Sequence, residues 1–575
     1  MRAGWYRGRR IRALAAAATV AALLAAAAPA LGAAQGKAAQ GKSAQGKGGG
    51  AGIASEAALA AADCDRERGT VKLPYQAAVP CARPFAEGDD NGGATYQGVT
   101  ADSIKVVVRR ADEADINAGQ SPPKDRATGQ NSTVEQAYAD AAAIFERTNE
   151  QWGRTVEFEY FDSTGGDEAA QRADAVAVLA MKPFAVIDVG GRNSPAGDVF
   201  QTLIAQGKVL SISATTGTNR QSIAQSPYRW TATTDYTATA IIGAEFVGKQ
   251  LVGKKAEYAG DDLKSKARVF GVIRSTAANA PELEYVNDEL ARYDVRTAVD
   301  LEYEPGSDSA TARQVAEQNA GPMVARLKDA GVTSLILLAA DYPTVGALTR
   351  AMKEQEYFPE IVTMGVGLID IGLLARGTPP GEFDQDVWSH AFGVLTLYPP
   401  VVGVTAGPSD LTFRWFWGDD QGVYWQTGFA TAEILFSGIH MAGPNLTPAT
   451  FKKGMFARPA VGGLAEDMRT STIRAYGKKA GLPYDEYMVG GDAVLAWWDP
   501  EQVGPSVSVA VADAKGNWMF LDEAKRYGRG DIPAKAKKFF DPATSMNAFA
   551  AVPAADQMPA YPCDDCPVAG GTVAP

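Results

Sequence analysis

Residues 183–216 read PFAVIDVGGRNSPAGDVFQTLIAQGKVLSISATT, and this stretch decides the fold. An apolar run over 184–189 predicts a strand that ends in a glycine-rich polar loop, and a helical segment leads to a second strand over 209–212. Strands joined in this way lie parallel, and α/β proteins bind ligands in the loops at the carboxyl ends of such strands. The backbone N–H groups at the following helix starts suit an anion such as a carboxylate. Because the loops contain no histidine, cysteine or paired carboxylates, we expect them to hold a small molecule.

The same alternation of strand and helix extends on both sides of this unit. Before it, we expect strands at 104–108 and 156–160 and helices at 134–150 and 168–181. After it, we expect strands at 269–273, 295–301, 334–338 and 361–364 and helices at 281–293, 310–330 and 345–355. Such alternation predicts parallel sheets with helices on both faces. One sheet of this many strands would be unusually large, so the pattern favours an α/β fold of two doubly wound, Rossmann-like lobes.

Bulky aromatic residues are concentrated between 411 and 425, before two helices expected at 427–441 and 448–455, the second capped near Thr447. These side chains either line a cleft or pack in the core, and core packing is the favoured interpretation. They are Phe413, Trp415, Phe416, Trp417, Tyr424 and Trp425.

The first 33 residues have the order of a secretory signal peptide, in which five arginines precede an Ala/Leu/Val run and a small-residue cleavage region. A transmembrane anchor is the alternative, but the run is short and rich in alanine. Residues 34–62 contain AQGK three times and are expected to form a flexible, low-complexity linker. Cleavage would make the chain five units more negative than its full-length charge of -12. Such acidity excludes nucleic acid and anionic lipid as expected partners.

Four cysteines in an exported chain predict two disulfides. Cys64 and Cys81 lie in the Pro/Gly-rich segment 63–97, whereas Cys563 and Cys566 lie in the C-terminal tail. Three pairings are open, and local pairing within each segment is the simplest. A metal or redox role for the C-terminal CDDC motif is the alternative, although no second thiol pair stands near it. We expect no metal and no cofactor.

With these pieces in place, the chain resembles the type I periplasmic binding proteins, in the branch of the leucine/isoleucine/valine-binding proteins. The motifs that carry the resemblance between residues 98 and 527 are GVTADSIKVVV (98–108), VIDVGGRNSPAGDVF (186–200), VLSISATTG (209–217), YRWTATTDYTATA (228–240), LILLAADYPTVGALTRAM (335–352) and GIHMAGPNLTPATFKKGMF (438–456). AGPNLTP and the CDDC tail further resemble an actinobacterial-type branch of this family.

The resemblance implies two lobes joined by three crossovers and a hinge, with the ligand between the lobes. It places the first lobe at 98–254, the second at 255–395, return segments shared by both at 396–527, and a tail at 528–575. It also implies the extracytoplasmic solute-binding component of an ABC importer, a monomer that is secreted or associated with the cell envelope. Its partners would be a small solute and a membrane permease.

Carried over by motif, the resemblance implies contacts to the solute from both lobes, through Asn193, Ser194, Ala214, Thr215, Thr216, Asn279, Tyr342 and Asp370. Tyr342 is expected in the loop before helix 345–355, either as a cover for the ligand or packed beside Pro343. Relatives that bind free amino acids usually carry an acidic residue after the strand equivalent to 361–364. Here Gly367 occupies that position, with Asp370 displaced and Asp341 a second candidate. A plain α-amino acid is therefore disfavoured, and the solute is a small polar or carboxylate-bearing molecule.

Two other functions compete with solute import. A secreted hydrolase is disfavoured, because the two histidines, His390 and His440, are in no HExxH motif and Ser194 is in no G-x-S-x-G motif. We therefore expect that the protein is not an enzyme. A ligand-sensing extracellular receptor of the same fold is the second alternative, and it would act through a separate signalling partner.

Overall fold

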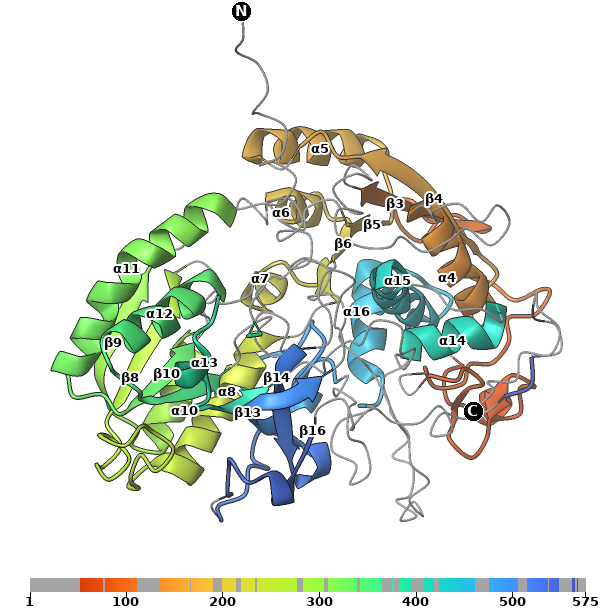
Figure 1. Ribbon diagram of the computed structural model, residues 1–575. Coiled ribbons are helices and arrows are strands. Elements are labelled where there is room, and N and C mark those ends of the chain that lie inside the picture. The colour runs from red at the N-terminus through yellow and green to blue at the C-terminus, as the bar shows by residue number, and fades with distance from the viewer. Residues whose placement is uncertain are drawn as a thin grey trace, which may run out of the picture.

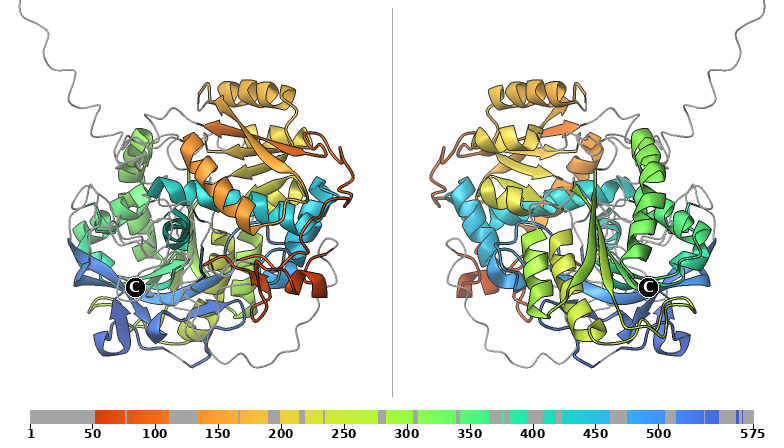
Figure 2. Two further views of the ribbon diagram at one scale, coloured as in Figure 1. Left: turned by 90° about the vertical axis from the view of Figure 1, so that its right-hand side faces the viewer. Right: turned by 90° about the vertical axis from the view of Figure 1, so that its left-hand side faces the viewer.

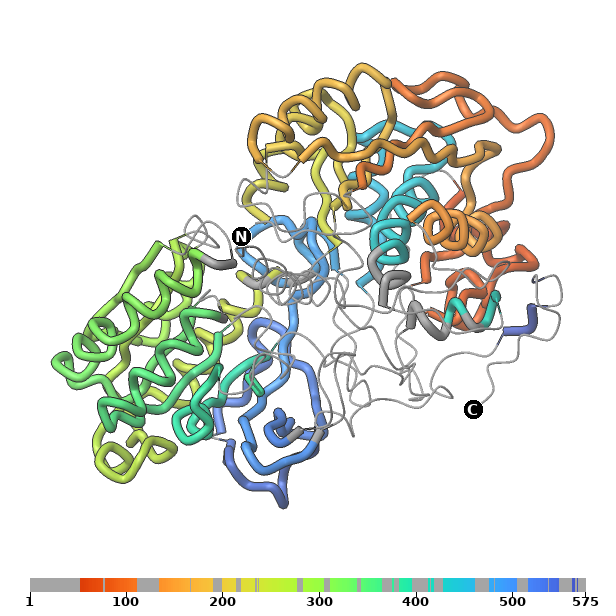
Figure 3. The backbone as a smooth tube through the Cα atoms, turned by 45° about the horizontal axis from the view of Figure 1, so that its top comes forward, coloured from red at the N-terminus to blue at the C-terminus, as the bar shows by residue number. Residues whose placement is uncertain are grey.

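A computed structural model of the chain has two lobes, each built on its own largely parallel sheet (Figures 1 and 3). It describes residues 52–566 except for gaps at 76–77, 111–133, 166, 190–198, 214–218, 233–234, 277–282, 305–308, 339–341, 365–374, 377–381, 396–407, 418–422, 461–474, 505–513, 536, 548–560 and 564–565. The expected signal peptide and most of the expected linker lie outside this part of the chain.

The first sheet contains five parallel strands in the order β4-β3-β5-β6-β7. Counted along the chain, this is the order 2-1-3-4-5 of flavodoxin-like doubly wound folds. The strands are β3 (Ser103–Arg110), β4 (Thr155–Asp162), β5 (Ala185–Asp188), β6 (Leu210–Ser213) and β7 (Arg229–Thr231). β5 and β6 are buried along their whole length, as expected for central strands of a sheet covered on both faces.

Helices cover both faces of the first sheet. On one face, α5 (Glu168–Ala180) and α6 (Val199–Gln206) pack around Val107 and Val186. On the other face, α4 (Val134–Thr148) packs against Val106 and Val108. α7 (Asn219–Ala224) leads into β7.

The second sheet repeats this order and then extends it. Its parallel part runs β9-β8-β10-β11-β12, again 2-1-3-4-5, and antiparallel strands continue from β12 through β13 and β14 to β16, with β15 paired to β13. The parallel strands are β8 (Phe270–Ser275), β9 (Thr297–Tyr303), β10 (Ser334–Leu338), β11 (Glu360–Met364) and β12 (Ala391–Leu395). The antiparallel strands are β13 (Asp492–Gly504), β14 (Ala514–Leu521), β15 (Arg526–Gly528) and β16 (Ser545–Asn547).

The second sheet is also covered on both faces, as Figure 2 shows for β8 and β9. α11 (Ser309–Asp329), α12 (Tyr342–Glu354) and α13 (Gln385–Trp388) pack around Ile273 on one face. α10 (Leu283–Arg292) packs around Val272 on the other.

Each lobe is completed by helices that follow the sheet of the other lobe. α8 (Tyr236–Phe246) follows β7 of the first sheet, yet it packs against β11, β12 and β13 of the second. Conversely, α14 (Pro408–Trp417), α15 (Val423–Ala442) and α16 (Pro448–Ala457) follow β12 but pack on the first lobe. The chain returns to the second sheet at β13, and so passes between the lobes three times. The first passage lies between β7 and α8, earlier than the expected boundary at 254, because the apolar helix α8 packs in the core of the second lobe.

The expected linker at 34–62 ends earlier than predicted. From Gly52 onward the chain is part of the first lobe: Arg83 N donates to Gly52 O at 3.0 Å, and Ser55 caps the short helix α2 (Glu56–Leu59). The strands β1 (Cys64–Asp65) and β2 (Thr70–Val71) form a hairpin beside it. The local disulfide pairing is confirmed, since Cys64 is bonded to Cys81 and Cys563 to Cys566.

Core packing, the favoured interpretation, is confirmed for three of the six aromatic residues, and Trp417 is partly buried against the same core. Phe413, Trp415 and Phe416 of α14 are at most 5% exposed and join the first lobe's core. The side chains of Tyr424 and Trp425 are outside the described part. The N-cap expected near Thr447 is confirmed as a capping box with Thr450 at the start of α16.

Candidate functional site

The strand order places the candidate site at the carboxyl ends of both sheets. In a 2-1-3-4-5 sheet the connections after the first and third strands leave on opposite faces, and the crevice between them is where doubly wound proteins bind ligands. These strands are β3 and β5 in the first lobe and β8 and β10 in the second. The site therefore involves one switch point from each lobe.

Most of the expected contact residues directly follow strands of these two sheets but lie outside the described residues themselves. β5 ends at Asp188 before Asn193 and Ser194, and β6 ends at Ser213 before Ala214, Thr215 and Thr216. β8 ends at Ser275 before Asn279, and β11 ends at Met364 before Asp370. All four strands are parallel members of their sheets, so each of these segments starts at the carboxyl edge that the sequence predicted.

The position predicted for Tyr342 is wrong. It is the first residue of α12 rather than part of a loop before the helix. Pro343 explains the earlier start, because proline is tolerated in the first turn of a helix, where its missing N–H has no partner to lose.

A fully buried arginine organises the carboxyl edge of the first sheet. Arg109 of β3 is 0% exposed, and its guanidinium forms ion pairs with Asp174 of α5 at 2.8 Å and with Asp188 of β5 at 3.1 Å. It also donates to Ser163 Oγ at 2.8 Å and lies 4.3 Å from the ring centroid of Phe200 in α6. One side chain therefore fixes the ends of β3 and β5 and the helices that cover this face.

The network continues toward the loop after β5. Gln201 Nε2 donates to Asp188 Oδ2 at 3.1 Å, so the residues on both sides of 190–198 are linked by a side-chain hydrogen bond. Thr164 Oγ1 donates to Asp174 Oδ1 at 2.6 Å and ties in the chain after β4. This network was not among the features predicted from the sequence. The sequence signal for it was a charged residue at the end of the apolar run in each of two strands, Arg109 in SIKVVVRR and Asp188 in AVID.

Each lobe also has an arginine near the carboxyl end of the first strand of its sheet, Arg110 in β3 and Arg274 in β8. Arg110 of β3 lies opposite Asp162 of β4 and pairs with it and with Glu135. Arg274 of β8 lies opposite Glu302 of β9 and forms an ion pair with it. Each guanidinium is about one-fifth exposed and is already neutralised by two carboxylates, so neither is poised to bind a carboxylate ligand.

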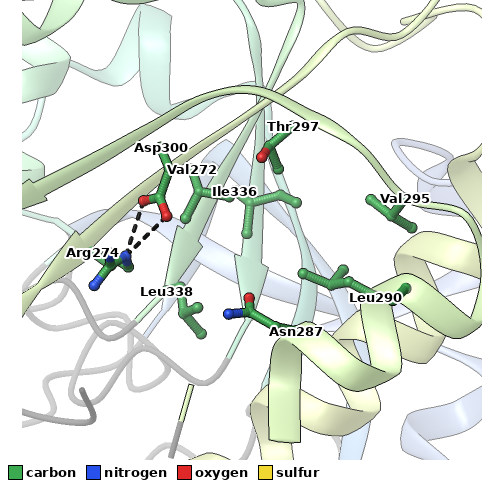
Figure 4. A pocket seen from close by; sticks show the side chains of 10 residues that line it. Val272, Arg274, Asn287, Leu290, Val295, Thr297, Asp300, Ile336 and Leu338 are labelled. Carbon is green, nitrogen blue, oxygen red and sulfur yellow. Dashed lines mark hydrogen bonds and ion pairs between the residues drawn. The ribbon is translucent and has the colours of Figure 1, made fainter. Parts of the chain in front are cut away.

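A cavity of about 200 Å³ lies beside Arg274, between α10 and the strands β8, β9 and β10 (Figure 4). Val272, Leu290 and Ile336 give it an apolar floor, and Asn287 and the Arg274–Asp300 pair stand at its rim, with Arg274 Nε 2.9 Å from Asp300 Oδ1. Pockets for whole small molecules are usually larger, roughly 300–1,000 Å³. This cavity has room for one small apolar group.

Both histidines have structural roles. His440 of α15 is buried, its Nδ1 accepts from Glu150 N at 2.8 Å, and its Nε2 lies 2.8 Å from Pro80 O. Burial lowers the pKa of His440 to about 4, so the ring is neutral and its tautomer is fixed by these two contacts. Burial also lowers the pKa of His390, whose Nδ1 lies 2.6 Å from Tyr258 O. Neither ring is arranged as a general base at the carboxyl edges of the sheets.

The part of the chain that the structure describes contains no group of three or more His, Cys, Asp or Glu side chains able to hold a metal ion. None of its helices combines the length and the apolar character that a membrane span requires.

Comparison with known proteins gave structural similarities only. No protein-family model matches the chain, and no curated protein matches it. A solute-binding protein of an ABC transporter from Rhodopseudomonas palustris HaA2, in complex with p-hydroxybenzoic acid, is 12% identical with a TM-score of 0.43, over 75% of this chain and 98% of that one. A fatty acid ABC transporter substrate-binding protein from Thermomonospora curvata is 14% identical with a TM-score of 0.42, over 76% and 96%.

An ABC transporter substrate-binding protein from Desulfitobacterium hafniense, in complex with Leu, is 9% identical with a TM-score of 0.41, over 74% and 100% of the two chains. The assignment of two Rossmann-like lobes rests on the strand orders and helix placement described above, which do not depend on these similarities.

Proposed function

We propose that the protein is the extracytoplasmic solute-binding component of an ABC importer and binds a small polar or carboxylate-bearing solute between its lobes. The observation that carries this proposal is the duplicated 2-1-3-4-5 sheet with exchanged helices, α8 on the second lobe and α14–α16 on the first. Three passages between two such lobes allow them to move as rigid bodies around a shared ligand. The sequence motifs resembling the type I periplasmic binding proteins support the same function.

The solute would be held mainly by residues that follow strands, and not by the arginines at the carboxyl edges. Asn193, Ser194, Thr215 and Thr216 are proposed to offer hydroxyl, amide and backbone N–H groups from the first lobe. Asn279, Tyr342 and Asp370 are proposed to complete the site from the second lobe. The arginines described at the carboxyl edges, Arg109, Arg110 and Arg274, are paired with carboxylates and would shape the site without binding the solute's charge.

The partners would be the solute and a membrane permease. The protein would act as a monomer outside the cytoplasm, after removal of its signal peptide. N-terminal sequencing of secreted protein should then start between about Leu31 and Gly36. Protein that retains Met1 in the membrane would contradict removal of the leader.

Native mass spectrometry of the purified protein tests the function directly, because a bound solute should appear as a defined added mass.

With the solute identified, Ser194→Ala and Thr216→Ala should each weaken binding by about 0.5–1.5 kcal/mol, or more if the solute is charged. Leucine, isoleucine and valine should bind poorly, since Gly367 stands where amino-acid binders carry a carboxylate. Unchanged affinity in both alanine variants would remove these loops from the site.

A further inference from the structure

Two of the three passages between the lobes meet at one place, here called the junction and made of Asp235 and residues 484–489. Asp235 stands between β7 of the first sheet and α8, whose N-terminus it caps by accepting from Thr237 N at 2.9 Å. Residues 484–489 precede β13, where the chain re-enters the second sheet. Asp235 N donates to Val489 O at 2.9 Å and so joins the two passages directly.

The junction is also attached to the first lobe. Tyr487 N donates to Asn219 Oδ1 of α7 at 3.0 Å, and Asn219 Nδ2 donates in turn to Asp485 O at 2.8 Å. Tyr487 Oη contacts Ser226 Oγ at 2.7 Å. Asn219 and Ser226 belong to the first lobe, and residues 484–489 lead into the second sheet. A change in the junction therefore changes how the two lobes are held together.

Two carboxyl groups, those of Glu486 and Asp235, are hydrogen-bonded to each other inside the junction. Glu486 is 0% exposed and Asp235 is 2% exposed. Tyr484 Oη donates to Asp235 Oδ2 at 2.6 Å, and Met488 N donates to Glu486 Oε1 at 2.7 Å. Among the described residues, no N–H or O–H group donates to Glu486 Oε2.

A carboxyl oxygen that is buried without a donor is satisfied only if a proton is present. Burial raises the pKa of Glu486 well above its ordinary value of 4.5, and the charge of Asp235 and a hydrogen bond with it raise that pKa further. The backbone N–H groups of Met488 and Tyr487 act in the opposite direction but are outweighed. Glu486 is therefore the group that holds the proton and donates it in a hydrogen bond to Asp235.

Within the described part of the chain, the other charged and aromatic groups recorded beside the junction have partners of their own. Asp485 pairs with Lys478 at 3.5 Å, and Asp492 pairs with Arg526 at 3.0 Å where β13 begins. Lys452 Nζ of α16 lies 5.7 Å from the ring centroid of Tyr487, and the ring of Tyr285 of α10 packs against that of Tyr484. None of these is among the groups that set the pKa of Glu486.

We propose that Glu486 and Asp235 form a proton-dependent latch that holds the first and third passages together. With the proton present, a carboxyl–carboxylate hydrogen bond joins the passages. Without it, two negative charges stand in contact inside a buried junction, so the junction loosens and water enters. Because the junction connects the lobes, the balance between open and closed lobes should depend on pH. Any effect of this balance on solute binding and release rests on the function proposed above.

Hydrogen exchange of the protein without added solute tests the latch. The peptide covering 484–489 reports on it, since the N–H groups of Tyr487 and Met488 are both bonded within the junction. After correction for the intrinsic pH dependence of exchange, its protection in the wild type should fall by up to tenfold per pH unit between 4.5, the ordinary pKa of a glutamate, and the raised pKa of Glu486 in the closed junction, because opening releases one proton in this range. Above the raised pKa the protection should level off. A peptide covering β10 in the same samples should keep its protection.

Three variants make the test decisive. Glu486→Gln supplies a permanent donor and should abolish the pH dependence. Asp235→Asn removes the facing charge while keeping a good helix cap, so it should narrow the pH range over which protection falls, because burial still raises the pKa of Glu486. Tyr484→Phe removes a hydrogen bond but keeps both carboxyls, so it should lower protection equally at every pH. The same pH dependence in the wild type and Glu486→Gln would overturn the latch. The result is independent of whether a solute is found, so the latch and the transport function can fail separately.

Discussion

Arg109 carries its charge into the interior of the first lobe, where Asp174 and Asp188 neutralise it. Removing one partner of a buried ion pair leaves an uncompensated buried charge, which costs about 3–5 kcal/mol. Arg109→Met should therefore lower the free energy of unfolding by about that amount in a urea titration. Arg296→Met is the control, because Arg296 is 86% exposed and its ion pair with Asp294 lies in solvent. Equal effects of the two substitutions would contradict the role given to Arg109.

His440 makes a pH-dependent contribution at the same scale. Its pKa is lowered from 6.5 to about 4 in the folded protein, so the unfolded chain takes up a proton first as the pH falls. The contribution of His440 to stability is complete above pH 6.5 and is lost as the pH falls to about 4, by on the order of 3 kcal/mol. His440→Gln should flatten this part of the stability profile in unfolding experiments at pH 4–7. A variant with the same acid slope as the wild type would show that other groups cause it.

At the scale of elements, the crossing of α15 and α16 depends on glycine. A Cβ on Gly454 would lie 2.5 Å from the backbone C and O atoms of Met441, which cannot move independently of α15. Gly454→Ala should therefore destabilise the first lobe by about 1–3 kcal/mol in thermal or urea unfolding. Gly428→Ala in α15 is the matched control, since its Cβ would lie 3.5 Å from Ala137 Cβ and 4.0 Å from Ala137 O, which are ordinary contacts, and helix propensity favours alanine. If Gly428→Ala destabilises as much as Gly454→Ala, close approach is not the cause.

Periodicity in the sequence predicted the parallel strands and their helices well, because each carries its own apolar pattern. The run 334–338 coincides with β10, and 104–108 lies inside β3. The same reasoning missed the antiparallel extension through β13 and the packing of α8 on the other lobe. Which sheet a helix covers is decided by contacts distant in sequence, and α8 is apolar on all sides.

The candidate site divides in the same way. Loop composition after β5 and β6 identified the carboxyl edge, since parallel strands end at one edge whatever their partners. The partners in the Arg109 network and in the junction could not be predicted, because Arg109 is 65 residues from Asp174 and Asp235 is even more remote in sequence from Glu486. Their importance comes from burial, which only the packed lobes create.

At the scale of the whole molecule, the C-terminal tail contacts both lobes. β16 pairs with β14 of the second sheet, and Ile532 N donates to Glu245 Oε1 of α8 at 3.1 Å. Farther along, Tyr561 Oη contacts Asp65 Oδ2 at 2.8 Å, and the blue segment that contains Tyr561 lies beside the N-terminal hairpin in Figure 1. The tail at 528–575 is thus attached at two places, one on each lobe.

Removing the residues after Asn547 should therefore affect the lobes unequally. The truncation deletes the acceptor of Trp415 Nε1, which donates to Tyr561 O at 3.0 Å, together with Cys563 and Cys566, which are buried in the first lobe's core. Hydrogen exchange should become faster in β1, β2 and α14, while β10 in the second lobe keeps its protection. Tyr561→Phe, which loses only the hydroxyl contacts, should give a smaller change confined to the hairpin β1–β2. Uniform loss of protection in both lobes would mean that the tail holds the lobes to each other, and an unchanged pattern would mean that its attachment to the first lobe adds no stability.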